Sequence, residues 1–156
     1  MKLTLSTILD VPPTQLWAEV TASRRLGHVA APLASFEPID PPALPPIWRE
    51  GRYLVRLRLF GWLAAGKHWI VISYPPGDAT PGAERFELRD NGHGGVAATW
   101  DHLIRLRALP DGRTLYADLV EVRAGLLTPL VWLFAQVFYR HRQRRWRRLA
   151  ARGFPA

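Results

Sequence analysis

Alternating apolar and polar positions recur through much of the chain and predict a series of strands. The clearest alternation is in Tyr53–Leu59, where apolar side chains face one side while Arg56 and Arg58 face the other. Further strands are predicted at Lys2–Leu9, Phe36–Ile39, Lys67–Tyr74, Arg85–Asp90, Ala97–Leu109 and Thr114–Val122. The segment at Pro110–Gly112 is typical of a hairpin turn, so the last two of these strands should pair antiparallel.

Helical spacing appears in three places. Two short helices are expected at Thr14–Thr21 and Ser23–Val29, directly after the first strand. A long helix is expected near the end of the chain, with Thr128 as N-cap and Pro129 at its first position. This helix is apolar on nearly every side up to Phe138. Its front half should therefore be enclosed by other elements.

The order of elements predicts an α+β domain spanning residues 1–156. A strand, two short helices, a run of antiparallel strands and a long helix follow one another along 156 residues. A sheet of six to seven twisted strands curls readily, and the final helix is the element that can fill its concave face. We expect a curved antiparallel sheet wrapped around the front half of that helix, with the basic end at 140–152 projecting toward solvent.

The net charge of +8 is concentrated near the end of the chain. Thirteen acidic residues balance thirteen Lys and Arg residues through position 122, whereas eight arginines and no acidic residue follow Val122. A solvated helix end explains this run, because cations complement the dipole at a helix C-terminus. The side chains proposed to face anions or a membrane are Arg140, Arg144, Arg147 and Arg148.

Three other interpretations of the basic run remain open. An anionic membrane surface could attract it, with Trp146, Phe138 and Tyr139 as interfacial anchors, or the helix could dock on a protein partner. Nucleic-acid binding is the least supported of these possibilities, because the rest of the chain is balanced in charge and carries no nucleic-acid motif.

Composition favours a folded cytoplasmic protein. The chain is 48% hydrophobic, has seven tryptophans and contains no cysteine. Its start lacks a signal-peptide pattern, and the apolar run at 126–138 is too short to span a bilayer. We expect a cytoplasmic location, with peripheral membrane contact as the alternative. The scattered histidines, without a metal-ligand spacing, predict no metal site, and no cofactor is expected. The sequence indicates no oligomeric state.

The later strands resemble those of the SRPBCC, or START-like, helix-grip superfamily. The likeness rests on Trp100-Asp101-His102, the hairpin exit Gly112-Arg113-Thr114 and Asp118, followed by a helix that is first apolar and then rich in arginine. It extends over the whole chain in the order of elements. Within the superfamily, the chain most resembles small bacterial ligand-binding proteins of the cyclase/dehydrase-like type.

This resemblance implies a cavity between sheet and final helix that binds or carries a hydrophobic small molecule or lipid. A binding role is placed ahead of an enzymatic one. The residues expected at the cavity are Trp17, Tyr53, Val55, Leu57, Trp100, His102, Ile104, Tyr116, Asp118, Leu130, Phe134 and Val137.

His102 and Asp118 are the candidates for catalysis. They lie on strands paired through the Pro110–Gly112 hairpin, so both could face the cavity as a pair for acid–base chemistry of a cyclase or dehydratase. The structural alternative is that they form a buried hydrogen-bonded pair that ties the sheet to the helix, since buried polar groups are nearly always paired.

Overall fold

The computed structural model describes residues 1–76 and 85–156 as one antiparallel sheet with helices on its concave side. The strands are β1 (Lys2–Leu9), β2 (Ala34–Asp40), β3 (Gly51–Leu59), β4 (Leu63–Ser73), β5 (Arg85–Gly94), β6 (Ala97–Ala108) and β7 (Thr114–Arg123). The helices are α1 (Pro13–Val20), α2 (Arg24–Ala30), the short 3-10 turn η1 (Gly125–Leu127) and α3 (Thr128–Ala151). The predicted α+β class and order of elements are confirmed.

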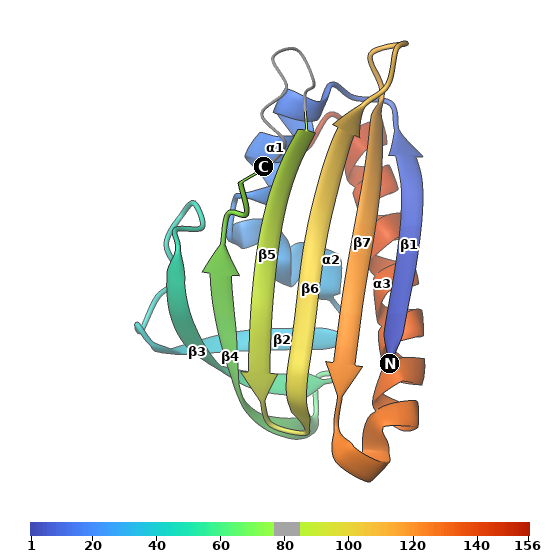
Figure 1. Cartoon of the computed structure of the whole chain (residues 1–156). Coiled ribbons are helices and arrows are strands. Elements are labelled where there is room, and N and C mark those ends of the chain that lie inside the picture. The colour runs from blue at the N-terminus through green and yellow to red at the C-terminus, as the bar shows by residue number, and fades with distance from the viewer. Residues whose placement is uncertain (77–84) are drawn as a thin grey trace.

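The sheet is strongly curved. Its strand order is β1-β7-β6-β5-β4-β3-β2, so the first strand pairs with the last and β2 forms the opposite edge. In Figure 1 the axes of the antiparallel strands β5, β6 and β7 are nearly aligned, whereas β2 lies almost across them on the far side. The curl leaves room for α2 and α3 on the concave face.

The β6–β7 hairpin confirms the predicted turn and the predicted antiparallel pairing. Leu109 N–H donates to Arg113 O at 2.8 Å, and Gly112 has the positive φ (84°) that suits glycine. Ile104 and Asp118 face each other in the register of the two strands, and both are buried. The inner face of this hairpin therefore forms part of the core.

The burial of α3 contradicts the prediction for its two halves. The front half carries the exposed side chains Leu130 (65%) and Leu133 (57%). The rear half, expected to project, buries Trp146 (2% exposed) and Leu149 (3%). The physical reason is a stripe at helical spacing that continues through the arginine run and packs on the sheet. Its members are Val131, Ala135, Phe138, Arg142, Trp146 and Leu149.

Hydrogen bonds hold the rear half of α3 against α2. Arg145 Nη2–H donates to His28 O at 3.0 Å, and His141 Nε2–H donates to Ala31 O at 2.7 Å. These bonds satisfy carbonyls at the end of α2 that have no partner within that helix. Residues 140–152 therefore belong to the packed structure.

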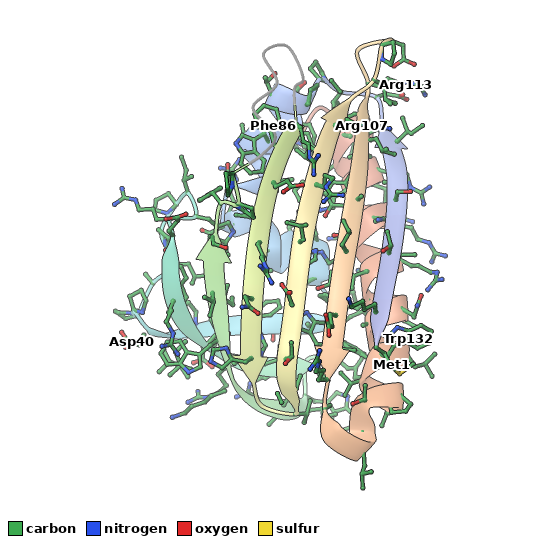
Figure 2. All side chains as sticks on the ribbon, in the orientation of Figure 1. Met1, Asp40, Phe86, Arg107, Arg113 and Trp132 are labelled. Carbon is green, nitrogen blue, oxygen red and sulfur yellow. The ribbon has the colours of Figure 1, made fainter. Side chains whose placement is uncertain are left out.

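The start of α3 is fixed by local and long-range bonds. Thr128 is the first helical residue and not the predicted N-cap. Its Oγ1 does not accept from an N–H of the first turn of α3, as an N-cap side chain would. Instead it donates back to Gly125 O at 2.7 Å and accepts from Ala124 N–H at 2.9 Å. Trp132 Nε1–H donates to Lys2 O at 2.9 Å, which places Trp132 beside the start of β1 (Figure 2).

Substitution of Trp146 tests whether the rear half of α3 is packed. Trp146→Ala should lower the free energy of unfolding by about 3–5 kcal/mol, because it leaves a large cavity against Tyr116. Arg147→Ala, at the exposed neighbouring position, should change it by no more than about 0.5 kcal/mol. Urea unfolding followed by tryptophan fluorescence and circular dichroism measures both. Equal effects of the two substitutions would show that the rear half is not packed.

Candidate functional site

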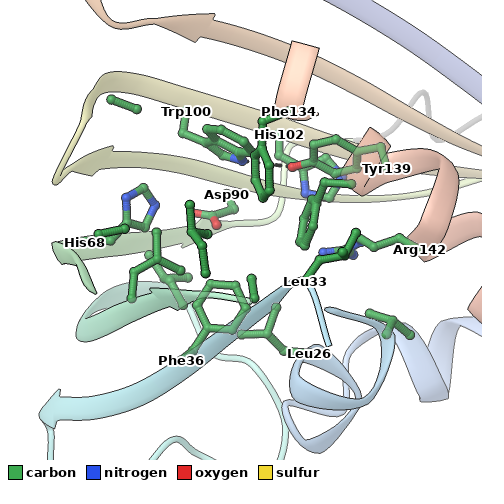
Figure 3. A pocket seen from close by; sticks show the side chains of 18 of the residues that line it. Leu26, Leu33, Phe36, His68, Asp90, Trp100, His102, Phe134, Tyr139 and Arg142 are labelled. Atoms are coloured by element: carbon green, nitrogen blue, oxygen red, sulfur yellow. Dashed lines mark hydrogen bonds between the residues drawn. The ribbon is translucent and has the colours of Figure 1, made fainter. Parts of the chain in front are cut away.

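A cavity of about 530 Å³ lies between the concave face of the sheet, α2 and α3. This volume is within the range of pockets that hold small organic ligands. Most of the wall is aliphatic or aromatic, and the side chains converge from the sheet, α2 and α3 (Figure 3). The interior therefore suits a molecule with a mainly apolar body.

The cavity has an apolar mouth. Six of its lining side chains are half exposed or more: Phe60, Val96, Leu127, Leu130, Leu133 and Val137. They come from the β3–β4 turn, the β5–β6 turn, η1 and the front half of α3. Phe60 packs edge-on against Phe134, with ring centroids 6.1 Å apart. An apolar molecule can thus approach the interior along an apolar surface.

The structure places the predicted cavity residues in two groups. Those that line the cavity are Leu57, Trp100, His102, Ile104, Leu130, Phe134 and Val137. Those that lie elsewhere are Trp17, Tyr53, Val55, Tyr116 and Asp118. The second group does not contribute to the wall of this cavity.

Packing explains the second group. Trp17 stacks on Phe86 with ring centroids 5.2 Å apart, and Tyr53 O–H donates to Arg49 O at 2.9 Å. Val55, Tyr116 and Asp118 are completely buried in the core. Alternation along a strand identifies the inner face. It does not tell which inner side chains are covered by their neighbours.

His102 and Asp118 form the predicted pair. His102 Nε2 lies 2.7 Å from Asp118 Oδ1, and both side chains are buried. Asp118 also accepts from Tyr116 O–H at 2.9 Å and from Gln143 Nε2–H at 2.9 Å. Burial alone would raise the pKa of Asp118, but the hydrogen bond from His102, the charge of Arg142 and the hydrogen bond from Gln143 hold it below its ordinary value. Asp118 is therefore an ionised acceptor with three donors.

This network fixes the tautomer of His102. Burial lowers the pKa of His102 although Asp118 opposes the change, so the ring is neutral at neutral pH. Because Asp118 accepts, Nε2 carries the hydrogen and Nδ1 carries the lone pair. The ring also lies 4.6 Å from that of Tyr139, whose hydroxyl accepts from Trp100 Nε1–H at 2.9 Å. His102 is the member of the pair that reaches the cavity.

Four acidic or basic residues of the cavity wall were not predicted from the sequence: Arg25, His68, Asp90 and Arg142, of which Figure 3 labels the last three. Asp90 continues the alternation of Phe86 and Leu88, and Arg142 lies on the buried stripe of α3, so both carried a readable signal. His68 did not, because its strand is apolar on both faces.

Gly92 permits His68 and Asp90 to share one region of the wall. A Cβ atom at this glycine would meet His68 Nε2 at 2.6 Å and Asp90 Oδ1 at 3.2 Å. Burial raises the pKa of Asp90 to about 7, even though Val71 N–H donates to its Oδ1 at 2.8 Å. Burial also lowers the pKa of His68. Both groups are thus biased toward their neutral forms.

The arginines predicted to face anions or a membrane are exposed: Arg140, Arg144, Arg147 and Arg148. The aromatic anchors predicted beside them are not available at the surface. The exposed fractions of Trp146, Phe138 and Tyr139 are 2%, 4% and 1%. The proposed aromatic anchoring of this helix in a membrane interface is therefore wrong. An attraction based on charge alone stays a prediction.

Two further features concern metals and membranes across the described residues 1–76 and 85–156. Within these ranges no three His, Asp or Glu side chains gather as a metal site would require. No helix there is long and apolar enough to cross a bilayer.

Solved structures with the same architecture were found despite low sequence identity. A conserved protein from Geobacillus kaustophilus aligns over 97% of this chain and 96% of its own, with 17% identity and a TM-score of 0.63. The chain has the helix-grip fold. A START superfamily protein from Mycobacterium smegmatis (12% identity, 97% of each chain, TM-score 0.59) shares the fold. So does the Zhui aromatase/cyclase from Streptomyces sp. R1128 (14% identity, 100% of this chain and 96% of that one, TM-score 0.60).

Sequence comparison alone finds no such relative, since no family model and no curated protein matches. The solved structures therefore confirm the expected START-like, helix-grip fold, and they confirm the fold alone.

The pKa of Asp90 predicts how stability depends on pH. Between its ordinary value of 3.8 and about 7 the folded protein holds a proton on Asp90 that the unfolded chain releases. The contribution of Asp90 to stability therefore falls as pH rises through this window. Asp90→Asn keeps an acceptor for Val71 and should stabilise the protein at pH 8 by roughly 2 kcal/mol, with little difference at pH 4. Urea denaturation at both pH values checks this, and a destabilised variant at pH 8 would contradict it.

Proposed function

We propose that this protein binds or carries a hydrophobic small molecule or lipid in the cavity between the sheet and α3. The observation that supports this most directly is the apolar cavity of about 530 Å³ with its exposed apolar mouth. Contiguous apolar surface exposed to water is unfavourable for a monomer, and it commonly marks a site of interaction. A ligand inside would cover the interior wall, and part of its body would cover the rim.

An acid–base enzyme is the second candidate, and the tautomer of His102 favours it. A neutral imidazole held by an ionised carboxylate has the arrangement of a general base, with the free lone pair on the nitrogen away from the carboxylate. Proton removal from a carbon next to a carbonyl group is the step that such a base would assist in a cyclase or dehydratase. The aromatase/cyclase that shares the fold makes this reaction class worth testing here.

Blocking the cavity tests the binding role. Leu57→Trp places an indole on the cavity wall, and Leu54→Trp places the same group on the opposite face of β3 as a matched control. Nile red, a neutral dye that fluoresces in apolar sites, should bind the wild type. Leu57→Trp should weaken binding about tenfold or more through lost space, whereas Leu54→Trp should leave it unchanged. Failure of the wild type to bind, or equal binding by both variants, would contradict the proposal.

Deuterium exchange tests the enzymatic alternative. We expect a bound 1-phenyl-1,3-butanedione to exchange its acidic C–H hydrogens faster than in buffer if His102 Nδ1 accepts the proton. In His102→Gln the rate should fall back to the buffer rate, while Nile red affinity stays within about threefold. Proton NMR in D₂O measures the exchange. An exchange rate in wild type equal to that in buffer would leave the binding role alone.

A further inference from the structure

Arg142 brings a positive charge into the cavity from the buried stripe of α3. Its side chain is 6% exposed, and the cavity wall includes it. Figure 3 shows it extending from α3 toward the interior, near Tyr139 and opposite Asp90. The guanidinium carbon lies 5.9 Å from the ring centroid of Phe138 and 5.5 Å from that of Tyr139.

The guanidinium makes no direct ion pair among the residues that the structure describes. No carboxylate oxygen in these ranges lies within 4.0 Å of it, and its Nε–H has no hydrogen-bond partner. The carboxylate of Asp118 interacts with it electrostatically but already accepts from His102, Tyr116 and Gln143. The Tyr116 hydroxyl also lies close to the guanidinium, but it is neutral, because burial raises its pKa.

Arg25 shows how the same fold satisfies a buried arginine that has a structural role. It is 4% exposed and also borders the cavity. Its Nε–H donates to Glu19 Oε2 at 2.5 Å, and its Nη2–H donates to Pro155 O at 2.9 Å. A buried cation is costly unless it is paired and hydrogen-bonded. Arg25 meets this condition within the chain, and Arg142 does not.

The other titratable groups facing this end of the cavity supply no fixed anion. His68 on β4 and His102 on β6 are neutral because burial lowers their pKa values. Asp90 on β5 has a pKa of about 7, so it is partly protonated at neutral pH. Tyr139 on α3 keeps its proton, since burial raises its pKa. At this end the cavity wall thus presents a cation, whereas the mouth is apolar. The ionised carboxylate that interacts with this cation, Asp118, is not part of the cavity wall and is already hydrogen-bonded to three donors.

We propose that the cavity takes an elongated apolar carboxylic acid, with its carboxylate bound by Arg142 and its hydrocarbon body directed toward the mouth. Planar guanidinium groups match carboxylates with two parallel hydrogen bonds. Leu130 at the mouth and Arg142 are twelve residues apart on α3, about 18 Å at 1.5 Å per residue. This distance favours a long body over a compact one. The inference rests on the proposed binding function and adds the class of ligand.

Ligands that share one chain and differ only in their head group test this assignment. Dodecanoic acid, 1-dodecanol and dodecylamine are titrated against the wild type preloaded with Nile red. The acid should displace the dye at a concentration roughly ten- to a hundredfold below that of the alcohol, and the amine should be weakest. In Arg142→Gln the preference for the acid over the alcohol should disappear while the affinity for the alcohol is kept. Arg140→Gln, exposed on the same helix, is the matched control and should behave as wild type.

The outcomes separate the ligand class from the binding role. If the wild type binds the dye but takes acid and alcohol equally, or if Arg142→Gln keeps the preference, the assignment is wrong and the binding role stands. If neither the dye nor any chain binds the wild type, both fail. Arg142→Lys keeps the charge but loses the planar head, so it should retain part of the preference. If Arg142→Gln does not fold, as judged by circular dichroism, two other results test the assignment. They are the preference for the acid that Arg142→Lys retains and the order in which the wild type binds the three head groups.

Discussion

One buried carboxylate fixes the long helix against the sheet. Asp118 on β7 accepts from His102 on β6, from Tyr116 on its own strand and from Gln143 on α3. Removing a donor from a buried charged acceptor is costly, so α3 cannot easily separate from the sheet at this point. Trp146 and Leu149 pack one and two turns further along the helix and reinforce the contact. The closed end of the structure lies here.

The cavity lies at the other end of α3, where the helix is packed on one side only. The front half of the helix rests on the β1 side through Trp132 and Val131, while Leu130, Leu133 and Val137 remain exposed at the mouth. The curled strands β2, β3 and β4 pass on the opposite side. The helix is thus held tightly at a polar end and borders an apolar opening at the other, an arrangement that suits an amphipathic ligand.

The sequence was sufficient for the architecture and insufficient for the burial of the helix. Alternation in β6 and the Pro110–Gly112 turn correctly predicted the hairpin and the His102–Asp118 pair. The share of apolar residues in each half of α3 was misleading, because those of the front half surround the helix and exceed what the sheet can cover. The spacing of Phe138, Trp146 and Leu149 carried the correct signal, and it also identifies Arg142 as inward-facing.

Other features of the site depend on packing that no local pattern encodes. Tyr116 and Asp118 lie on the inner face as expected, yet His102 and α3 cover them. His68 lies on a strand that is apolar on both faces, so its direction depends on pairing with β5. The volume of the cavity depends on how far the sheet curls around α3, which is a property of the whole chain.

The most direct test of ligand binding in this cavity is a crystal structure of the protein grown with dodecanoic acid. We expect continuous electron density between the sheet and the front half of α3, with the carboxylate within hydrogen-bond distance of the Arg142 guanidinium and the chain ending near Leu130. A cavity closed by inward-turned side chains, or filled by ordered water while the acid lies elsewhere on the surface, would contradict it.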